Sequence, residues 1–428
     1  MAKRRTTAIN VLVFPAGETN AIELHDALAT CVNINLYGAS SKERHGRFVF
    51  ENYTAGLPLI TDASFLTEFN SFLVEKKIDV IFPTHDTVAL FMAENRKRIK
   101  ARVLVSDVKT AEICRDKIKT YALFSDCPFC PAVYDAPPYP YPVFVKPKNG
   151  QGGVGARLVA RSEDLSANLE DFVVCEYLPG EEYTVDCLTD AHGKLLVVSP
   201  RSRLRLMAGV CVSGQTEAVS PEIAEIAETL NRRLSFVGLW YFQIKKNADG
   251  NWKLLEISAR CASSMCLTRV RGLNLPLLSV YAAMGYDVTA EPNAVGITMD
   301  RALISRYKID YHYETVYFDF DDTLTVRGKV NLRAIWFLYQ CRNWCKKVVL
   351  LTKHERELAD SMARYAIHPA LFDEIVHIAP EEHKADHINP QNAIFIDNAY
   401  QERADVYRRH GIPVFDVDAI EVLMDWRI

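Results

Sequence analysis

The stretch PVFVKPKNGQGGVG, residues 142–155, sets the expectation for the rest of this 428-residue chain. A short apolar strand is expected to end at Lys146, and a loop follows at once with the glycines Gly150, Gly152, Gly153 and Gly155. Glycine lets backbone N–H groups turn towards a ligand without a Cβ in the way, and the lysine supplies a positive charge. The pattern predicts a phosphate cradle, although a surface hairpin could use the same glycines for its turn alone.

The composition points to a globular protein with small ligands. At about 100–200 residues per domain the length predicts several domains, and 49% hydrophobic with 24% charged residues is ordinary for such a chain. A net charge of −4 gives no reason to expect nucleic acid as a partner. No apolar run approaches the ~18–20 residues of a membrane span. The scattered cysteines suit a reducing compartment. We therefore expect a cytoplasmic protein that binds neither membranes nor nucleic acid.

The first part of the chain alternates strands and helices, as a parallel α/β sheet does. Apolar runs and helical spacing predict elements in the order 9–14, 20–29, 33–37, 62–76, 78–83 and 88–100. His85 and Asp86 follow the strand at 78–83, where ligands bind in open parallel sheets, so they could contact substrate. A helix cap formed by Asp86 or Thr87 is an equal alternative. This domain is expected to cover 1–110.

Acidic and amide side chains follow or lie in the later predicted strands. Glu176 ends an apolar strand before the turn at Pro179, which could offer an acceptor and backbone groups to adenine, and Glu182 beyond the turn could reach ribose hydroxyls. Gln243 lies in the strand expected at 239–245, and Glu256 lies near the end of the returning strand.

The run SPRSRLRL at 199–206 alternates strictly between polar and apolar side chains in its second half. On one strand, Arg201, Arg203 and Arg205 would share a face, because side chains of a strand alternate between its two sides. Three guanidiniums in a row would bind phosphate or carboxylate oxygens. A solvated outer face is the alternative until the neighbouring motifs are considered.

Four motifs occur in one order, each at a predicted strand or loop: VKPKNGQGGVG at 145–155, EYLPGEEYTVD at 176–186, YFQI at 241–244 and LLEISAR at 254–260. Through them the region from about 8 to 305 resembles the ATP-grasp superfamily, most closely the carbamoyl-phosphate-synthase-like branch that includes amino-acid ligases. The resemblance implies a mixed α/β and α+β architecture. A Rossmann-like domain would precede an ATP-grasp domain at 111–312.

The resemblance also implies a role for each residue. Those expected to bind ATP are Lys117 and Lys146 at the phosphates, Gly150, Gly152, Gly153 and Gly155 above them, Glu176 and the Leu178 backbone at adenine, and Glu182 at the ribose. Those expected to hold Mg²⁺, or Mn²⁺ in its place, are Gln243, Glu256 and Ser258. Ser258 stands where the family usually has Asn, and its shorter reach would weaken a second magnesium site.

The implied chemistry is carboxylate activation. A carboxylate attacks the γ-phosphate of ATP, which gives an acyl phosphate and ADP, and an amine then displaces phosphate. Arg260 would lie beside the transferred phosphoryl group, and Arg201, Arg203 and Arg205 would contact substrate. Cations are needed because negative charge gathers on the transferring oxygens.

A second group of strand-end residues begins after residue 314. Asp319, Thr352 and Asp397 each follow or end an apolar strand, in TVYFD, VVLLT and AIFID, so a parallel sheet would gather them at one edge. Lys384 lies between the last two on a predicted helix. Two carboxylates at that edge could bind magnesium, and a lysine and a hydroxyl could hold phosphate.

With DFDDT at 319–323, this arrangement resembles the haloacid-dehalogenase-like superfamily, which consists mostly of phosphatases, over about 313–428. The resemblance implies that Asp319 is the nucleophile and that Asp321 protonates the leaving group and later activates water. The other implied roles are phosphoryl binding by Thr323, Thr352 and Lys384, and magnesium binding by Asp319, Asp321 and Asp397, with Asn398 where a second Asp is frequent. The short gaps between the motifs leave no room for a cap domain. We therefore expect a bulky phosphorylated substrate, or a lid supplied by the ligase half of the chain or by another subunit.

The sequence therefore predicts a cytoplasmic enzyme with two activities. A ligase would join a small carboxylate to an amine, and a phosphatase would act on a phosphorylated metabolite of the same pathway. One alternative is an ATP-grasp module that binds nucleotide without turnover and regulates the phosphatase. Another is an active ligase whose last domain only stabilises or dimerises it. A homo-oligomer is compatible with each of these.

Overall fold

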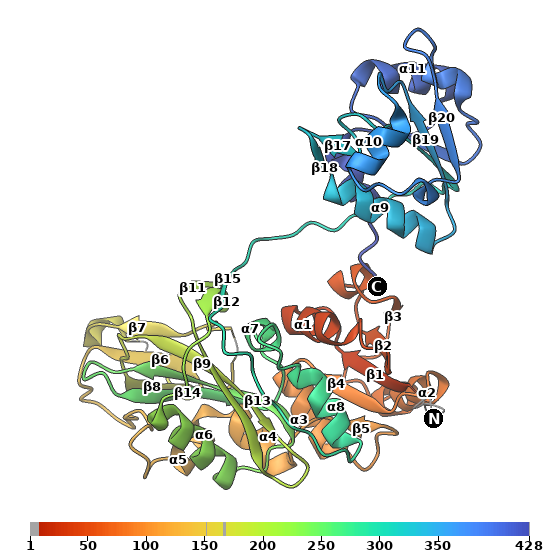
Figure 1. Ribbon diagram of the computed structural model, residues 1–428. Coiled ribbons are helices and arrows are strands. Elements are labelled where there is room, and N and C mark those ends of the chain that lie inside the picture. Colours follow the sequence, from red (N-terminus) through yellow and green to blue (C-terminus); the bar gives the residue numbers. More distant parts are fainter. Residues whose placement is uncertain (1–7, 151, 166–167, 428) are drawn as a thin grey trace. The chain divides into compact units, whose positions relative to one another are not determined.

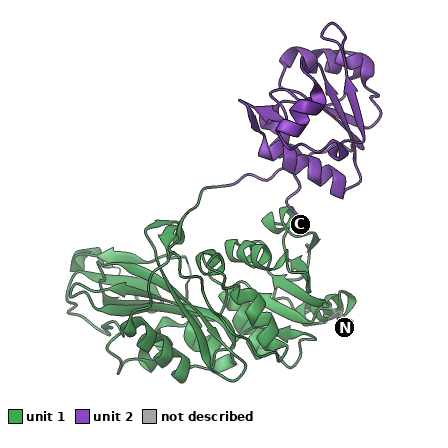
Figure 2. Ribbon diagram, viewed as in Figure 1, with its two compact units in different colours: residues 1–303, 428 green, residues 304–427 purple. Residues whose placement is uncertain are grey.

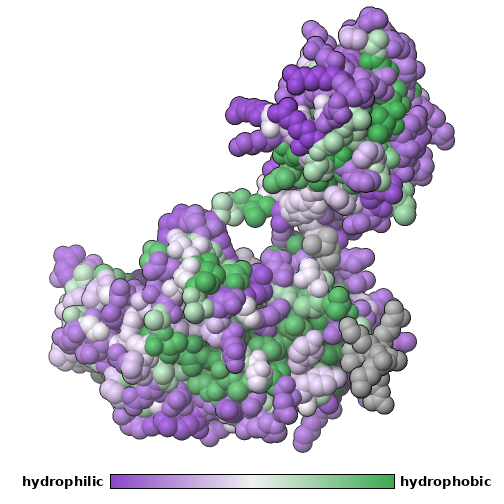
Figure 3. Space-filling model, in the orientation of Figure 1, coloured by the Kyte–Doolittle hydropathy of each residue, from purple (hydrophilic) through white to green (hydrophobic). Residues whose placement is uncertain are grey.

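The computed structural model describes residues 8–150, 152–165 and 168–427. The chain divides into two compact units, with the boundary in the sequence between Leu303 and Ile304 (Figure 2). In the view of Figure 3 the surface of both units is mostly hydrophilic, with hydrophobic side chains in separate patches. Within the described ranges, no helix combines the length and the apolar character that crossing a membrane requires. The predicted three-domain division at 110 and 312 stays a prediction.

The first part of unit 1 is a five-stranded parallel sheet in the order β3-β2-β1-β4-β5 (Figure 1). Its strands are β1 (Ile9–Phe14), β2 (Ile34–Ala39), β3 (Asn52–Thr54), β4 (Val80–Pro83) and β5 (Arg102–Val103). The helices along this part are α1 (Thr19–Leu28), η1 (His45–Phe48), α2 (Phe65–Glu75), α3 (Asp86–Glu94) and α4 (Val108–Arg115). In β1, Val11 and Val13 pack into one hydrophobic core while Leu12 and Phe14 pack into another, so both faces of the sheet are covered.

The rest of unit 1 contains three antiparallel sheets. Their orders are β7-β6-β8, β10-β9-β13-β14 and β11-β12-β15. The strands are β6 (Val143–Pro147), β7 (Arg157–Val159), β8 (Phe172–Glu176), β9 (Glu182–Thr189), β10 (Leu195–Ser202), β11 (Arg205–Met207), β12 (Val210–Gln215), β13 (Gly238–Lys246), β14 (Trp252–Ser258) and β15 (Thr298–Asp300). The helices are α5 (Lys117–Leu123), η2 (Ser162–Asp164), α6 (Pro221–Arg233), α7 (Cys266–Arg269) and α8 (Leu275–Ala283).

Helix α6 shows how local sequence fixes these elements. Ser220 caps it, because its hydroxyl accepts the N–H of Ile223, and Pro221 takes the first turn, where no N–H is needed. Ile226 and Leu230 lie one turn apart on the buried face, which packs into the core shared with β9, β13 and β14.

Unit 2 is built on a five-stranded parallel sheet in the order β20-β19-β16-β21-β22. Its strands are β16 (Thr315–Phe318), β19 (Lys347–Thr352), β20 (Glu374–His377), β21 (Ala393–Ile396) and β22 (Val414–Phe415), with a hairpin of β17 (Thr325–Val326) and β18 (Lys329–Val330). The helices are α9 (Leu332–Asn343), α10 (Leu358–Arg364), η3 (Pro369–Leu371), η4 (Lys384–His387), α11 (Tyr400–His410) and η5 (Val417–Leu423). Val316 and Phe318 pack on one face of the sheet and Tyr317 on the other.

Candidate active sites

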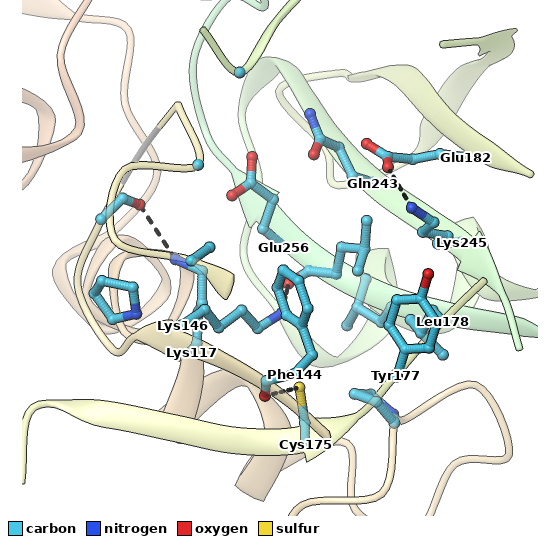
Figure 4. A pocket seen from close by; sticks show the side chains of 18 of the residues that line it. Lys117, Phe144, Lys146, Cys175, Tyr177, Leu178, Glu182, Gln243, Lys245 and Glu256 are labelled. Atoms are coloured by element: carbon cyan, nitrogen blue, oxygen red, sulfur yellow. Dashed lines mark hydrogen bonds and ion pairs between the residues drawn. The ribbon is translucent and has the colours of Figure 1, made fainter. Parts of the chain in front are cut away.

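Unit 1 contains a cavity of about 240 Å³ lined by elements of its three antiparallel sheets and by α5. Its charged and polar lining residues include Lys117, Tyr121, Lys146, Glu176, Tyr177, Glu182, Arg203, Gln243, Lys245 and Glu256, and Gly150, Gly152 and Gly153 line it from the glycine loop. Most of the residues predicted to bind ATP or Mg²⁺ therefore face one space, although they come from segments as distant in the sequence as Lys117 and Glu256 (Figure 4).

Two buried lysines give this cavity its positive charge. Lys146 lies on β6, and its Nζ donates to the Leu255 carbonyl at 3.1 Å and to the Tyr121 hydroxyl. Lys117 opens α5, and its Nζ donates to the Gly150 carbonyl at 3.2 Å. In the described part of the chain neither lysine has a carboxylate within ion-pair distance. Burial lowers the pKa of Lys146, and the neighbouring Lys117 lowers it further. Two buried cations without carboxylates favour an anionic ligand.

The glycine loop touches a second loop across the cavity. Gly152, Gly153 and Gly155 have φ between +66° and +77°, which is the left-handed region that suits glycine. The turn between β11 and β12 meets this loop so closely that a Cβ on Gly209 would lie 1.9 Å from the Gly152 carbonyl oxygen. Arg203 Nη2 donates to the Gly209 carbonyl at 3.0 Å and thereby ties the turn to the wall of the cavity.

The predicted adenine and ribose residues have protein partners of their own. Glu176 Oε1 accepts the Ala132 N–H at 3.0 Å. Glu182 pairs with Arg203 at 2.9 Å and with Lys245 at 3.2 Å. Lys245 was missed at the sequence level, although it follows Gln243 by two residues on β13 and so shares its face.

Gln243 and Glu256 stand directly opposite each other in the β13–β14 register. Their side chains project into the same part of the cavity (Figure 4). An amide oxygen and a carboxylate at this spacing are hard oxygen donors, so the pair fits Mg²⁺, which usually takes one or two protein ligands and completes its shell with water and phosphate. The described residues contain no group of three or more His, Cys, Asp or Glu arranged for a metal.

Ser258 and Arg260 are bound to Asp86 rather than exposed to the cavity. The Ser258 hydroxyl lies 2.9 Å from Asp86 Oδ1, and Arg260 Nε and Nη2 donate to the two oxygens of Asp86 at 2.8 and 3.0 Å. Burial acts to raise the pKa of Asp86, but Arg260 and Ser258 outweigh it and lower that pKa. The helix-cap alternative for Asp86 is wrong, because His85 is the N-cap of α3 and its Nδ1 accepts the Thr87 N–H.

The expectation that three arginines share one strand face is wrong. Strand β10 ends at Ser202 and Arg205 belongs to β11 in another sheet. Arg201 is buried and pairs with Asp186 at 2.8 and 2.9 Å, whereas Arg205 is 59% exposed and pairs with Asp300 at 2.5 Å. Arg203 is the member of the three that lines the cavity, so a row of free guanidiniums does not form.

In unit 2 the predicted nucleophile lies at the carboxyl edge of the sheet. Lys384, at the start of η4, donates from Nζ to Asp319 Oδ1 and to Asp397 Oδ2, each at 2.6 Å. Burial raises the pKa of Asp319, Lys384 opposes this, and Asp397 adds to it. Burial also raises the pKa of Asp397. The carboxylates of Asp319 and Asp397, which both face Lys384, fit an added Mg²⁺, because Mg²⁺ prefers oxygen ligands such as carboxylates.

Thr323 and Thr352 lie at the same edge, with different surroundings. The Thr323 hydroxyl lies 3.2 Å from Asp319 Oδ2 and accepts the Asn398 N–H at 3.1 Å. The Thr352 hydroxyl is fully buried and lacks a hydrogen-bond partner within the described structure. A buried hydroxyl without a partner is costly, and a phosphoryl oxygen would satisfy it.

Asp321 contacts a residue that sequence reasoning missed. Its carboxylate lies 2.8 Å from His354 Nδ1 and is half-exposed, so it stands outside the hydrogen-bonded group around Lys384. His354 follows Thr352 by two residues at the carboxyl end of β19, which is the position that could have revealed it.

Comparison with known proteins places unit 1 in a known fold. A family model described as ATP-grasp in the biosynthetic pathway with Ter operon matches residues 168–302. Solved structures align over about two thirds of the chain. The biotin carboxylase domain of Hydrogenobacter thermophilus 2-oxoglutarate carboxylase with MgADP has a TM-score of 0.54 at 16% identity, covering 67% of this chain and 72% of that one. This is an ATP-grasp fold.

Two further ATP-grasp neighbours are ligases or synthetases by name. The L-amino acid ligase from Bacillus licheniformis has a TM-score of 0.52 at 18% identity and covers 65% of this chain and 75% of its own. The N5-carboxyaminoimidazole synthetase of Staphylococcus aureus, complexed with ADP, has a TM-score of 0.54 at 14% identity, with 68% and 80% covered. At such identities the likeness concerns the fold.

Curated relatives match in sequence as well. The 3-methyl-D-ornithine–L-lysine ligase of Methanosarcina barkeri is 30% identical over 119 residues, which is 27% of this chain and 32% of that protein. The arginine-specific carbamoyl phosphate synthase large chain of Bacillus subtilis is 24% identical over 310 residues, 64% of this chain and 28% of the relative. The chain therefore spans about a third of the length of these relatives. The predicted ATP-grasp fold of unit 1 is confirmed, whereas the family match ends at residue 302, ahead of unit 2.

Proposed function

We propose that unit 1 is an ATP-dependent ligase that joins a carboxylate to an amine through an acyl phosphate. The observation that supports this most is the convergence of Lys117, Lys146 and the glycine loop on the cavity that Gln243 and Glu256 also line. The lysines match the charge of the nucleotide phosphates, and the backbone of the loop can donate N–H groups to them. Magnesium bound at Gln243 and Glu256 would offset charge between the β- and γ-phosphates.

In the proposed reaction a substrate carboxylate oxygen attacks the γ-phosphorus, and the bond to the β–γ bridging oxygen breaks to release ADP. The amine then attacks the acyl carbon, and phosphate leaves. Lys146 holds transferring oxygens, and Arg260, which Asp86 holds outside the cavity lining but close to Glu256, adds positive charge to that end of the site. Relatives named as joining amino acids support an amino acid as at least one of the two substrates.

The test is release of ADP from Mg²⁺ and ATP over pairs of amino acids. Lys146→Ala is expected to abolish it, because the charge at the phosphates is lost. Lys194→Ala alters an exposed lysine in the β9–β10 turn and is the matched control. Equal ADP release by the two variants would contradict the assignment.

We further propose that unit 2 is a Mg²⁺-dependent phosphatase. The supporting observation is the Asp319–Lys384–Asp397 bridge beside the unpartnered hydroxyl of Thr352. Asp319 attacks phosphorus and the ester oxygen leaves with a proton from Asp321. Water then attacks the aspartyl phosphate and returns a proton to Asp321, which restores both residues. A fused phosphatase would act on a precursor or product of the ligase.

A generic ester, 4-nitrophenyl phosphate, tests this second activity. Hydrolysis by the full chain with Mg²⁺ is expected, and Asp319→Asn should remove it. The variant keeps the shape of the side chain but is a poor nucleophile. Hydrolysis that Asp319→Asn leaves intact would refute the nucleophile assignment.

One observation favours a different function for unit 1. The Ser258 hydroxyl is bound to Asp86, so it does not add a ligand beside Glu256. A single weak magnesium site suits a module that binds nucleotide without turnover and regulates unit 2 or a partner. Tight ATP binding without ADP formation over the whole amino-acid panel would support this alternative.

A further inference from the structure

Three side chains of unit 2 form a hydrogen-bonded chain, and the proposed mechanism gives a role to Asp321 but not to His354 or Ser361. His354 Nδ1 lies 2.8 Å from Asp321 Oδ2, and His354 Nε2 lies 2.7 Å from Ser361 Oγ. When Asp321 is ionised, Nδ1–H donates to the carboxylate and Nε2 is left to accept the Ser361 hydroxyl. The imidazole is therefore held through both of its nitrogens.

The surroundings of His354 fix it further. Its ring packs edge-on against Phe320 with the centroids 5.2 Å apart, and its carbonyl lies 2.6 Å from His377 Nε2. The side chain of His354 is 9% exposed, whereas that of Asp321 is 54% exposed. The chain of hydrogen bonds thus runs from a buried helix residue to an accessible carboxylate.

Exposure to solvent decides which end of this hydrogen-bonded chain, Ser361 or Asp321, can react with a substrate. Serine, histidine and aspartate also form triads in which the serine is the nucleophile. Here Ser361 is buried in the middle of α10, and the end that faces solvent is the carboxylate of Asp321. The histidine and serine are therefore placed to support the carboxylate rather than to activate the hydroxyl.

We propose that His354, anchored by Ser361, is a positioning residue that orients Asp321 for proton transfer. The proposal rests on the phosphatase function given above. As Asp319 attacks phosphorus and the ester P–O bond breaks, the proton of the Asp321 carboxyl moves to the leaving oxygen, and His354 Nδ1–H stabilises the carboxylate that forms. Water attack on the aspartyl phosphate returns a proton to Asp321. His354 keeps its own proton throughout.

Two phosphate esters separate this role from a purely structural one. Phenyl phosphate has a basic leaving oxygen that needs a proton, whereas the nitrophenolate of 4-nitrophenyl phosphate leaves readily without one. General acid assistance contributes about 10²–10⁴-fold. We expect His354→Ala to lower kcat/KM for phenyl phosphate by about 10–100-fold and for 4-nitrophenyl phosphate by less than about threefold.

Graded variants sharpen the test. His354→Asn places an amide N–H near the position of Nδ1 and should recover most of the loss, while Ser361→Ala should cause a smaller loss with the same preference between esters. His312→Ala is the matched control, since His312 also faces a carboxylate, Glu314 at 3.4 Å, but is 72% exposed. The control should keep both rates.

The outcomes are distinct. Equal rate losses on the two esters, or none, in folded His354→Ala would overturn the positioning role and leave the phosphatase standing. Thermal unfolding of the full chain shows whether each variant folds. If His354→Ala does not fold, the comparison of the two esters is made with His354→Asn and Ser361→Ala. Failure of the unaltered chain to hydrolyse either ester would overturn the phosphatase itself and this role with it.

Discussion

Gly209→Ala probes the contact between the glycine loop and the β11–β12 turn. The added Cβ would lie 1.9 Å from the Gly152 carbonyl oxygen and 2.3 Å from its carbonyl carbon. Both atoms belong to the backbone, so no side-chain rotation relieves the overlap. To restore an ordinary contact of about 3.5 Å, one of the two loops must retreat by roughly 1.5 Å. If the glycine loop is the one that moves, the loop proposed to cover the nucleotide phosphates is displaced.

Gly250→Ala separates this clash from the cost of the backbone conformation. Gly250 has φ +84°, close to the +75° of Gly209, but nothing lies within 4 Å of a Cβ built on it. Each substitution places an L residue in the left-handed region at a cost of about 1–2 kcal/mol. Gly250→Ala therefore has the backbone strain of a left-handed L residue but no overlap with a neighbouring atom.

ATP affinity by titration calorimetry and ADP release are the measurements. A misplacement of about 1 Å can cost roughly 100-fold in rate, so we expect about that loss for Gly209→Ala together with weaker ATP binding. Gly250→Ala should lower the unfolding temperature slightly and keep ATP affinity. If the two variants bind ATP equally well, the contact with Gly152 has no part in forming the nucleotide site.

Four further outcomes are expected. Asp186→Ala should cost about 3–5 kcal/mol in urea unfolding because Arg201 is left buried and unpaired, while Asp300→Ala, which frees exposed Arg205, should change stability by less than about 1 kcal/mol. Asp86→Asn should lower the rate of ADP release and keep the Kd of ATP, since it frees Arg260 but leaves Lys146 in place. Thr352→Val should slow ester hydrolysis without loss of stability, because the deleted hydroxyl has no hydrogen-bond partner in the described part of the chain. Chelation of Mg²⁺ by EDTA should abolish ester hydrolysis, and added Mg²⁺ should restore it.

Much of the unit 1 site could be predicted because its residues follow strands in local motifs. Lys146, Glu176, Gln243 and Glu256 are each placed by their own strand, so the motif order was enough to bring them to one cavity. The burial of Arg201 could not be predicted from the residues next to it in the sequence. Its partner Asp186 lies on the neighbouring strand β9, and this carboxylate in the buried part of that strand, between Val185 and Cys187, was the available signal.

Unit 2 shows the same division. A parallel sheet gathers its strand ends whatever the intervening sequence, so Asp319 and Asp397 could be placed together from pattern alone. His354 could not be paired with Asp321, because that contact depends on how the loop after β19 turns towards the loop after β16. Tertiary packing decides such contacts, and no spacing rule along the chain encodes them.

The charges of the two sites differ in a way that bears on their ligands. Among the described residues of unit 1, Lys117 and Lys146 are buried without carboxylate partners, so the cavity itself attracts an anion. In unit 2 the single charge of Lys384 is already shared between Asp319 and Asp397 at 2.6 Å, and a phosphate ester would bring further negative charge to that group. Electrostatic balance there requires an added cation. In the proposed ligase, magnesium would thus bind together with the nucleotide. In the proposed phosphatase, the phosphate ester would not bind without it.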